Sequence, residues 1–346
     1  MRAAPGAFVQ VSNPMRAALT AVAVALTVLA CGFPSRSPSS EAERFKMRIA
    51  GYYWPGMYWV DVAKEKGFFA EAGIDAEIVD ASGDYLGSLD WVAAGKVDTN
   101  VFNLYDVLRR NAEGSLLQLV LLSDTTLGAD VLLAKSPIRA IASLKGKRIG
   151  LIPGSYQEAV LASALESGRV GLDEVTIVPW SGDPIPAPDA PIDALVTWEP
   201  FATDATDSRQ WNRLFDTSRI RGGLPFGYAF RSDYVARHPM AVQRFVEVWH
   251  RTSAYMEAHP LEAHAIVARR YGQSPDAVAA LAKFDIVYTL DDNVRAFAYG
   301  AGPVSIHNTA RRMSRLLIAQ DRAARMIDST LIVEPRFVRA LAAVRE

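Results

Sequence analysis

Aromatic and acidic side chains follow the ends of several apolar runs that are typical of strands. Trp54 comes directly after residues 47–53, and Trp198 with Glu199 ends the run at residues 191–199. Ligands of open α/β sheets bind beyond the carboxyl ends of strands, so we expect these residues to face a cleft. Two tryptophans on opposite sides can hold a flat or apolar molecule between them. A carboxylate beside them would pair with a donor or a cationic group on that molecule.

A predicted helix start in the second half of the chain offers a different chemistry. Gly154-Ser155 opens this helix, where backbone N–H groups and the positive end of the helix dipole can receive an anionic group. The other candidates include Asp124, Asp130 and Glu199, and no Arg or Lys falls at a strand end of the first half. We therefore expect a neutral heterocycle, an amine or a zwitterion to fit better than a bare anion such as nitrate.

The full set of candidate ligand-binding residues collects the strand ends and helix starts of this kind. It consists of Tyr53, Trp54, Tyr58, Asn103, Asp124, Thr125, Ser155, Tyr156, Trp198, Glu199 and Tyr228. A structural role is the alternative for each of them. Aromatic residues near a sheet edge are often part of the core, Glu199 can stabilise a helix N-terminus through the dipole, and Gly154-Ser155 can be an ordinary N-cap.

Alternating strand and helix patterns predict the elements that position these residues. Strands are expected at residues 47–53, 74–80, 97–103, 116–124 and 129–135, with helices at 59–73, 88–96 and 105–114. The pattern then repeats, with strands within 143–155, 174–180 and 191–201 and a helix at 156–168. This order implies mostly parallel sheets covered by helices. A late strand is expected near residues 226–230, and the chain from Asp233 onward is expected to be almost all helical.

The doubled pattern predicts an α/β protein of two lobes with a cleft between them. Lobe I is expected to be discontinuous, comprising residues 47–135 and 216–346, and lobe II to comprise residues 136–215. Chain segments near the two crossings can act as hinges, since a few residues at element ends absorb the rotation of one lobe against another. We therefore expect the lobes to close around a ligand.

The N-terminus has the pattern of a lipoprotein signal peptide. Residues 17–30 are uncharged and apolar, follow Arg16 and end at Cys31. Fourteen residues are too few to span a bilayer as a helix, and Val28-Leu29-Ala30-Cys31 resembles a bacterial lipobox. We expect residues 1–31 to be the signal peptide with its lipobox cysteine, Cys31 to be acylated, and the Ser- and Pro-rich residues 32–46 to be a flexible tether. The protein would then lie on the periplasmic or extracytoplasmic face of a membrane.

Composition excludes several classes of function. The net charge is −1 and no basic stripe occurs, so nucleic acid is not an expected partner. Cys31 is the only cysteine, which leaves the folded part without a disulfide, a cysteine-based metal site or a thiol nucleophile. The five histidines show no metal-binding spacing. We expect a monomer that has no cofactor and no bound metal.

Five segments together resemble a known family, the nitrate, sulfonate, taurine and thiamin-pyrimidine binding proteins of ABC importers. The segments are VAKEKGFFAEAGID (62–75), AAGKVDTNV (93–101), LKGKRIGLIPGS (144–155), VTWEP (196–200) and AHPLEA (258–263). The resemblance implies a two-lobed type II periplasmic-binding fold with a helical C-terminal third, a small-molecule ligand between the lobes and an ABC permease as partner. The chain departs from the family at SGDPIPAPDAP (181–191), where four prolines exclude the usual helix.

The function expected from these observations is capture of a small organic molecule, outside the cytoplasm, by a lipid-anchored importer subunit. A sulfonate, a pyrimidine or other heterocycle, and an amine are the ligand classes left open. The same fold resembles a thiamin-pyrimidine synthase and menaquinone-pathway enzymes, but the synthase needs a cysteine cluster. An enzyme is therefore the alternative rather than the expectation. A ligand receptor for a membrane sensor kinase is a further alternative.

Overall fold

The structure is a computed structural model that describes residues 44–82, 84–181, 184–187, 189–220, 222–300, 302 and 304–344. All of these belong to one compact unit, Ala42–Glu346. The predicted signal peptide, the lipidation of Cys31 and most of the predicted tether lie outside the described residues. Within the described part of the chain, no helix is long and apolar enough to cross a membrane.

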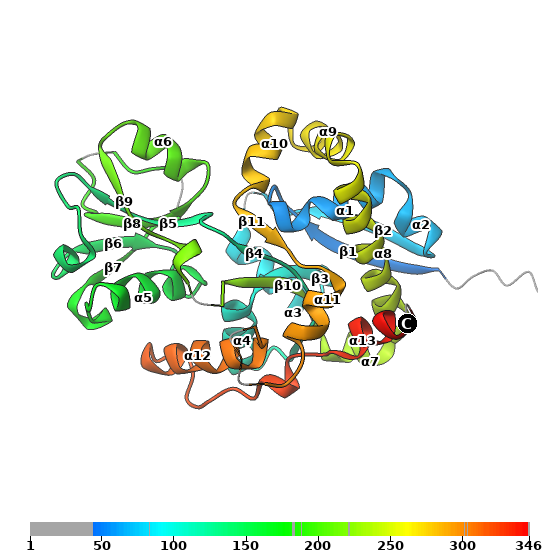
Figure 1. The fold of residues 1–346 in the computed structure, drawn as a ribbon. Coiled ribbons are helices and arrows are strands. Elements are labelled where there is room, and N and C mark those ends of the chain that lie inside the picture. Colours follow the sequence, from blue (N-terminus) through cyan, green and yellow to red (C-terminus); the bar gives the residue numbers. More distant parts are fainter. Residues whose placement is uncertain are drawn as a thin grey trace, which may run out of the picture. The chain divides into compact units, whose positions relative to one another are not determined.

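Lobe I is built on a mixed six-stranded sheet with the order β11-β4-β10-β3-β1-β2 (Figure 1). β1 is parallel to β2 and β3, whereas β10 runs antiparallel between β3 and β4, and β11 runs antiparallel to β4. The strands are β1 (Phe45–Gly51), β2 (Ile74–Asp80), β3 (Thr99–Asn103), β4 (Leu117–Thr126), β10 (Pro225–Arg231) and β11 (Asp285–Val287). Every residue of β3 is buried, so this central strand is covered on both faces.

Lobe II is built on a five-stranded sheet with the order β7-β6-β8-β5-β9. β6 is parallel to β7 and β8, and β5 is antiparallel to β8 and β9. The strands are β5 (Asp130–Lys135), β6 (Arg148–Leu151), β7 (Thr176–Pro179), β8 (Ala194–Trp198) and β9 (Trp211–Asp216). Helices α5 (Gln157–Ser167) and α6 (Phe201–Asp207) pack on this sheet. The described residues between β7 and β8 contain no helix, as the four prolines predict.

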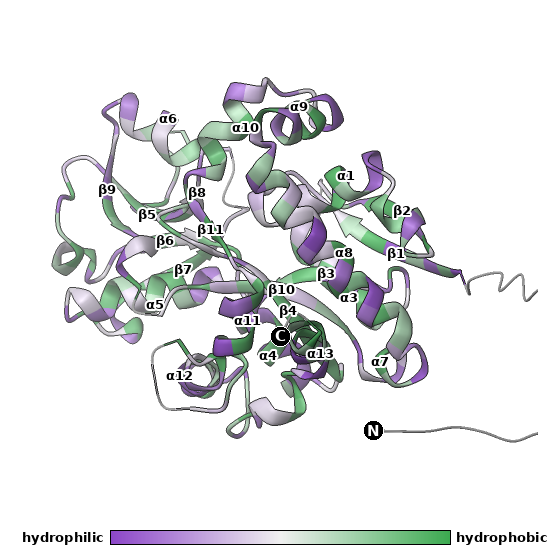
Figure 2. Cartoon of the chain, turned by 45° about the vertical axis from the view of Figure 1, so that its right-hand side comes forward, coloured by the Kyte–Doolittle hydropathy of each residue, from purple (hydrophilic) through white to green (hydrophobic). Residues whose placement is uncertain are grey.

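The remaining helices belong to lobe I, and most of them follow β10. They are α1 (Tyr58–Glu65), α2 (Phe68–Glu71), α3 (Tyr85–Ala93), α4 (Leu104–Ala112), α7 (Ser232–Arg237), α8 (Pro239–Ala258), α9 (Pro260–Tyr271), α10 (Pro275–Ala282), α11 (Leu290–Ala296), α12 (Ile306–Ala319) and α13 (Arg336–Ala343). Most of these helices carry hydrophilic residues on part of their surface, while the strands are mainly hydrophobic (Figure 2). The helical C-terminal third is confirmed, although the short strand β11 interrupts it.

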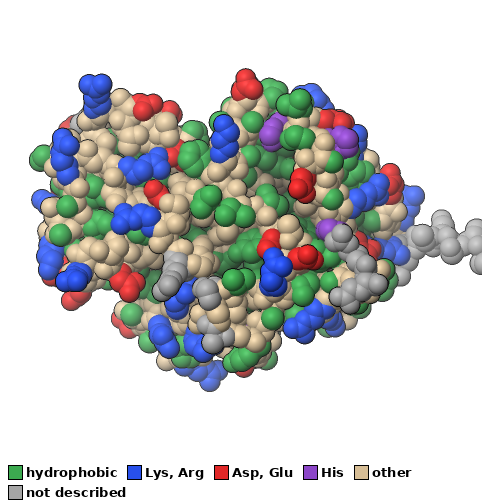
Figure 3. Space-filling model, viewed as in Figure 1, with side chains coloured by type: hydrophobic (Ala, Val, Ile, Leu, Met, Phe, Trp, Pro, Cys, Tyr) green, Lys and Arg blue, Asp and Glu red, His purple; other side chains and the backbone are tan. Residues whose placement is uncertain are grey.

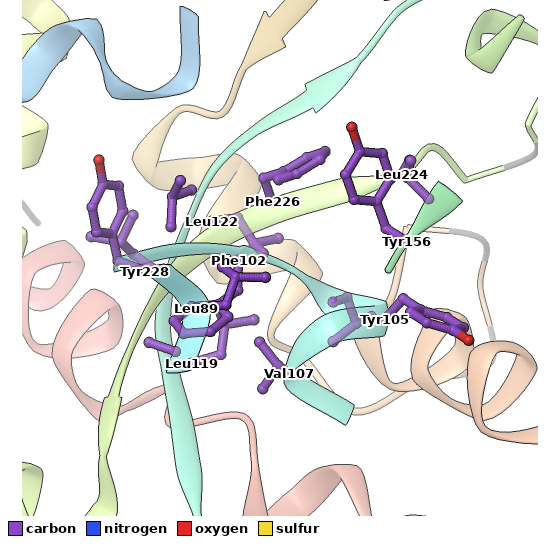
Figure 4. Close-up of a cluster of buried hydrophobic side chains, with 14 of the residues drawn as sticks. Leu89, Phe102, Tyr105, Val107, Leu119, Leu122, Tyr156, Leu224, Phe226 and Tyr228 are labelled. Atoms are coloured by element: carbon purple, nitrogen blue, oxygen red, sulfur yellow. The ribbon is translucent and has the colours of Figure 1, made fainter. Parts of the chain in front are cut away.

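Aromatic residues from sheet and helices form the core of lobe I. Trp59 on α1 contacts Tyr228 on β10 and Phe245 on α8, with ring centroids 5.2 Å apart in both pairs. Figure 4 shows Tyr228 and Phe102 within the same group of buried side chains. These rings exclude water from the sheet, and each large buried side chain contributes about 1.5–3 kcal/mol to stability.

The chain crosses between the two lobes at residues 127–129 and returns through residues 217–224. The first crossing lies before β5, whereas the sequence analysis placed residues 130–135 in lobe I. The difference arises because the apolar patterns of β4 and β5 are alike, and a pattern of buried residues does not specify which sheet a strand joins. β5 pairs with β8 and β9, so it belongs to lobe II.

Candidate ligand-binding site

A cavity of about 430 Å³ lies between the two lobes, at the carboxyl ends of β1, β2, β6 and β8. Ligand pockets have volumes of this order. Eight of its fifteen lining residues are aromatic. The lining consists of Tyr52, Tyr53, Trp54, Ala81, Ser82, Tyr85, Ile152, Tyr156, Trp198, Glu199, Pro200, Phe201, Phe226, Gln273 and Leu281. In the space-filling view a notch is visible at the upper edge, between the sides of the molecule that carry α6 and α10 (Figure 3).

The aromatic rings form a connected series that joins the two lobes. Tyr52 meets Tyr85 edge to face with centroids 5.7 Å apart, and Tyr85 meets Tyr156 at 6.0 Å. Tyr156, which comes from lobe II, also meets Phe226 of β10 at 5.2 Å, and these two rings lie near each other in Figure 4. Phe226 in turn lies 6.4 Å from Trp54. The series gives the cavity a wall of ring surface with contributions from both sides.

Three of these rings donate their one polar hydrogen to a buried carboxylate. The pairs are the Tyr156 hydroxyl with Asp130 at 2.8 Å, the Tyr85 hydroxyl with Asp106 at 3.0 Å, and Trp54 Nε1 with Asp124 at 3.2 Å. All three carboxylates are 0% exposed. The donors of these rings are therefore used inside the protein, and a ligand would meet ring surface and hydroxyl oxygens.

Burial makes the carboxylates behind the cavity difficult to ionise. It raises the pKa of Asp130 to about 7, although the hydrogen bond from the Tyr156 hydroxyl opposes the rise. It also raises the pKa of Asp124 to about 6, against hydrogen bonds from Ser123 and Trp54. The neighbouring Asp124 raises the pKa of Asp130 further, since like charges disfavour ionisation. This group of acids therefore takes up protons more readily than exposed carboxylates do.

The helix start at Gly154-Ser155 is occupied by the protein itself. The Gly154 N–H donates to Glu158 Oε1 at 2.8 Å, and the Ile152 N–H donates to Gln157 Oε1 at 2.8 Å. Gly154 has a φ of +75°, a left-handed conformation that favours glycine. An external anion would have to displace the Glu158 carboxylate from this position. The anion site that the sequence suggested here is therefore filled by an internal carboxylate.

Helices α3 and α6, which contribute residues to the cavity, and helix α4 also begin with side-chain caps. In each, an oxygen of a nearby side chain accepts a hydrogen bond from a backbone N–H of the first turn. These contacts are Asp84 with the Gly87 N–H of α3 at 2.8 Å, Asn103 with the Tyr105 N–H of α4 at 2.9 Å, and Glu199 with the Thr203 N–H of α6 at 3.0 Å. These amides are therefore already engaged, and they offer little to an anionic ligand.

Glu199 has partners within the protein on both of its oxygens. One oxygen accepts the Thr203 N–H, and the other forms an ion pair with Arg213 of β9. The Glu199 side chain is 1% exposed and that of Arg213 is 31% exposed. The structure thus gives this carboxylate the helix-capping role that was the alternative in the sequence analysis. Pairing of Glu199 with a ligand would require Arg213 to move away.

The structure brings five of the eleven predicted site residues to the cavity and places the other six around it. The five are Tyr53, Trp54, Tyr156, Trp198 and Glu199. Asp124 lies behind the Trp54 ring. The others have structural contacts: Tyr58 packs with Tyr53, Tyr228 is in the core, Asn103 caps α4, Thr125 accepts the Leu224 N–H, and Ser155 donates to the Ile152 carbonyl. Side chains alternate in direction along a strand, so a position near a strand end does not ensure that a side chain faces the cavity.

Several lining residues were missed by the sequence analysis. Tyr52 and Tyr85 lie just beyond β1 and β2, so the rule that selected Trp54 would also have found them. Phe226 begins the predicted late strand, next to the selected Tyr228. Gln273 and Leu281 come from the helical C-terminal third, and no local pattern links them to a site that the preceding parts of the chain form.

The protein has two lobes, each with its own α/β sheet, and two crossing segments join them around a cavity. This arrangement defines a periplasmic-binding-protein fold. The family follows from the sequence match. Residues 54–263 match the NMT1/THI5 like family, and the chain belongs to that family.

The curated relatives carry names from two areas. The chain is 30% identical over 152 residues to a Haemophilus influenzae protein named "Putative thiamine biosynthesis protein", a match that covers 42% of this chain and 48%, about half, of that protein. It is 27% identical over 247 residues to a Brucella abortus protein named "Putative binding protein", covering 66% of this chain and 72% of the relative.

Solved structures show the same fold at low identity. The alkanesulfonate-binding protein SsuA of Xanthomonas axonopodis pv. citri, bound to MOPS, aligns with a TM-score of 0.67 and 19% identity over 85% of this chain and 99% of that one. The desulfurization enzyme DSZB aligns with a TM-score of 0.60 and 18% identity over 88% of this chain and 100% of that one. Binding proteins and an enzyme therefore share this fold. The residues of the cavity, rather than the fold, have to show to which of the two classes a protein belongs.

Proposed function

We propose that this protein is the extracytoplasmic receptor of an ABC importer and captures a small, flat organic molecule between its lobes. The observation that carries the proposal is the cavity of about 430 Å³ whose aromatic wall is assembled from both lobes. Rings from two sides can bury both faces of a planar ligand. A ligand held this way favours the closed arrangement of the lobes, because only that arrangement supplies both sets of contacts.

A heterocycle or an amine suits this cavity better than a sulfonate. No Lys, Arg or His is among the described residues that line it. The N-termini of α3, α5 and α6 beside it are capped by Asp84, Glu158 and Glu199. A sulfonate would lose its hydration without gaining a cationic partner from the described lining, and burial of an uncompensated charge is costly. MOPS binding by the Xanthomonas protein is therefore not carried over to this chain.

The receptor role is favoured over an enzyme on the same fold. The sole cysteine, Cys31, lies in the predicted signal peptide. The described lining of the cavity contains one carboxylate, Glu199, and that group is engaged with Arg213. The described lining of the cavity therefore offers ring surface for binding, with no thiol and no carboxylate that lacks a partner. The proposal includes lipidation of Cys31, which would hold the receptor beside its permease.

A binding screen of the full-length protein in detergent tests the proposal. Thermal shift and calorimetry should detect a planar heterocycle or aromatic amine, and should detect neither nitrate nor a short alkanesulfonate. Trp198→Ala should weaken the binding of a confirmed ligand about tenfold or more, because one wall of the cavity is lost. Trp91→Ala is the matched control, since Trp91 contacts Lys96 outside the cavity. Tight binding of a sulfonate, or equal effects of the two variants, would contradict the proposal.

A further inference from the structure

We propose that the ligand is an organic cation and that the buried carboxylates of Asp124 and Asp130 are the counter-charges that select it. This inference rests on the receptor function proposed above and adds the charge of the ligand to it. It also gives these two acids a role, since neither of them lines the cavity.

Each of the two carboxylates accepts a hydrogen bond from a ring of the aromatic wall. Asp124 is near the end of β4 and accepts the Trp54 Nε1–H, whereas Asp130 begins β5 and accepts the Tyr156 hydroxyl. Trp54 belongs to lobe I and Tyr156 to lobe II, so each lobe places one acid behind one of its own rings. Asp130 is also the cross-strand partner of Trp198. A ligand that contacts Trp54 and Tyr156 would touch the two rings that are hydrogen-bonded to these acids.

Among the described residues, no Lys, Arg or His forms an ion pair with these acids. Asp130 is 0% exposed, and its Oδ2 has no hydrogen-bond partner in the described part of the chain. The nearby Asp285 on β11 has no partner on either carboxylate oxygen within the same part. Burial raises the pKa of Asp285, and the negative charges of Asp124 and Asp130 raise it further. Buried acids normally have a cationic partner, so a site for an external cation explains their arrangement.

The backbone beside Asp124 is shaped around the carboxylate. A Cβ atom at Gly56 would lie 1.9 Å from Asp124 Oδ1, so only glycine allows this close approach. Gly56 follows Trp54 by two residues in the same segment. The backbone of this segment therefore contacts Asp124, while the Trp54 ring lines the cavity. Trp54, Ser123 and the Gly56 backbone contact this acid, and no Lys or Arg among the described residues pairs with it.

The wall itself also favours a cation. The face of an aromatic ring is electrostatically negative and attracts a cation within about 6 Å of the ring centre. A carboxylate that accepts the ring's polar hydrogen adds its own negative potential in a region of low dielectric, where charges interact strongly. Among the described residues no group of three His, Cys, Asp or Glu is placed to hold a metal ion. The cation that fits is therefore organic and large enough to contact several rings.

Isosteric probes test the charge directly. Trigonellinamide is a pyridinium cation, meta-toluamide is its neutral isostere, and para-toluenesulfonate is an anionic aromatic probe. Calorimetry with the full-length protein at about pH 8, above the pKa values of Asp124 and Asp130, should give an affinity for trigonellinamide about tenfold or more above that for meta-toluamide, with no binding of the sulfonate. Asp130→Asn, and separately Asp124→Asn, should reduce this preference to about threefold or less and leave the affinity for meta-toluamide nearly unchanged. Asp233→Asn, at an exposed ion pair on α7, is the matched control and should keep the full preference.

Each alternative outcome has a defined meaning. Equal or tighter binding of meta-toluamide by the native protein overturns the inference and leaves the receptor function intact. The same holds if both Asn variants fold, as shown by cooperative unfolding, and keep the native preference. Should both variants fail to fold, the comparison of the two isosteres on the native protein still decides. If none of the three probes binds, both this inference and the proposed aromatic binding site are wrong.

Discussion

Replacing Glu199 by Gln should lower the stability of the protein more than it lowers ligand affinity. The neutral amide keeps an oxygen for the Thr203 N–H but loses the charge that faces Arg213. A hydrogen bond with a charged partner is worth about 1.5–3 kcal/mol. The Arg213 side chain is 31% exposed, so water replaces part of the lost interaction. We therefore expect the free energy of unfolding to fall by about 1–2 kcal/mol.

Thermal and urea unfolding of Glu199→Gln, Arg213→Met and the double variant measure this effect. The Tm should fall by about 2–4 °C for each kcal/mol, and the double-mutant cycle should give a coupling energy of about 0.5 kcal/mol or more. Asp233→Asn, which removes one charge of an exposed ion pair, is the control and should leave the Tm nearly unchanged. A native Tm for Glu199→Gln, together with a loss of ligand affinity of about tenfold, would refute this reasoning and show that the carboxylate serves the ligand.

Three further predictions follow from other parts of the molecule. Arg322 of lobe I pairs with the buried Glu158 of lobe II at 2.7 Å, so Arg322→Met should lower the free energy of unfolding by about 1–2 kcal/mol in calorimetry. The equivalent change at the exposed Arg336 is the control. Equal effects of the two variants would argue against an inter-lobe contact. Asp130 keeps its proton in the folded state up to about pH 7 but loses it near pH 3.8 when unfolded. The free energy of unfolding should therefore fall by at most about 4 kcal/mol as the pH rises from about 4 to 7, and then level off. Asp130→Asn should flatten this dependence of stability on pH, and an unchanged dependence would contradict the raised pKa of Asp130. Cys31→Ser should abolish lipid labelling and membrane retention, which fractionation of cells would show; retention at the native level would exclude lipidation as the anchor.

Local patterns were sufficient to predict much of the fold and part of the site. Strand and helix periodicity placed most elements of both lobes, because burial of one face repeats along a segment whatever surrounds it. The strand-end rule found Trp54, Tyr156 and Trp198, since the chain direction at the end of a parallel strand is determined by that strand itself. It also selected Tyr58 and Tyr228, which the structure places among core and helix contacts. Tyr58 begins helix α1, and position along a strand does not specify which face the Tyr228 side chain joins.

The sequence by itself determined the family, the alternation of elements, the absence of a helix in the Pro-rich segment and the aromatic character of the strand ends. Only the tertiary structure decided how the charges are paired. Glu199 pairs with Arg213, fourteen residues away on another strand, and Glu158 reaches Arg322 in the other lobe. It also decided that Asp124 and Asp130 have no cationic partner among the charges that shift their pKa values. Pairing of charges depends on distances between segments that are remote in sequence, and packing of the two sheets sets those distances.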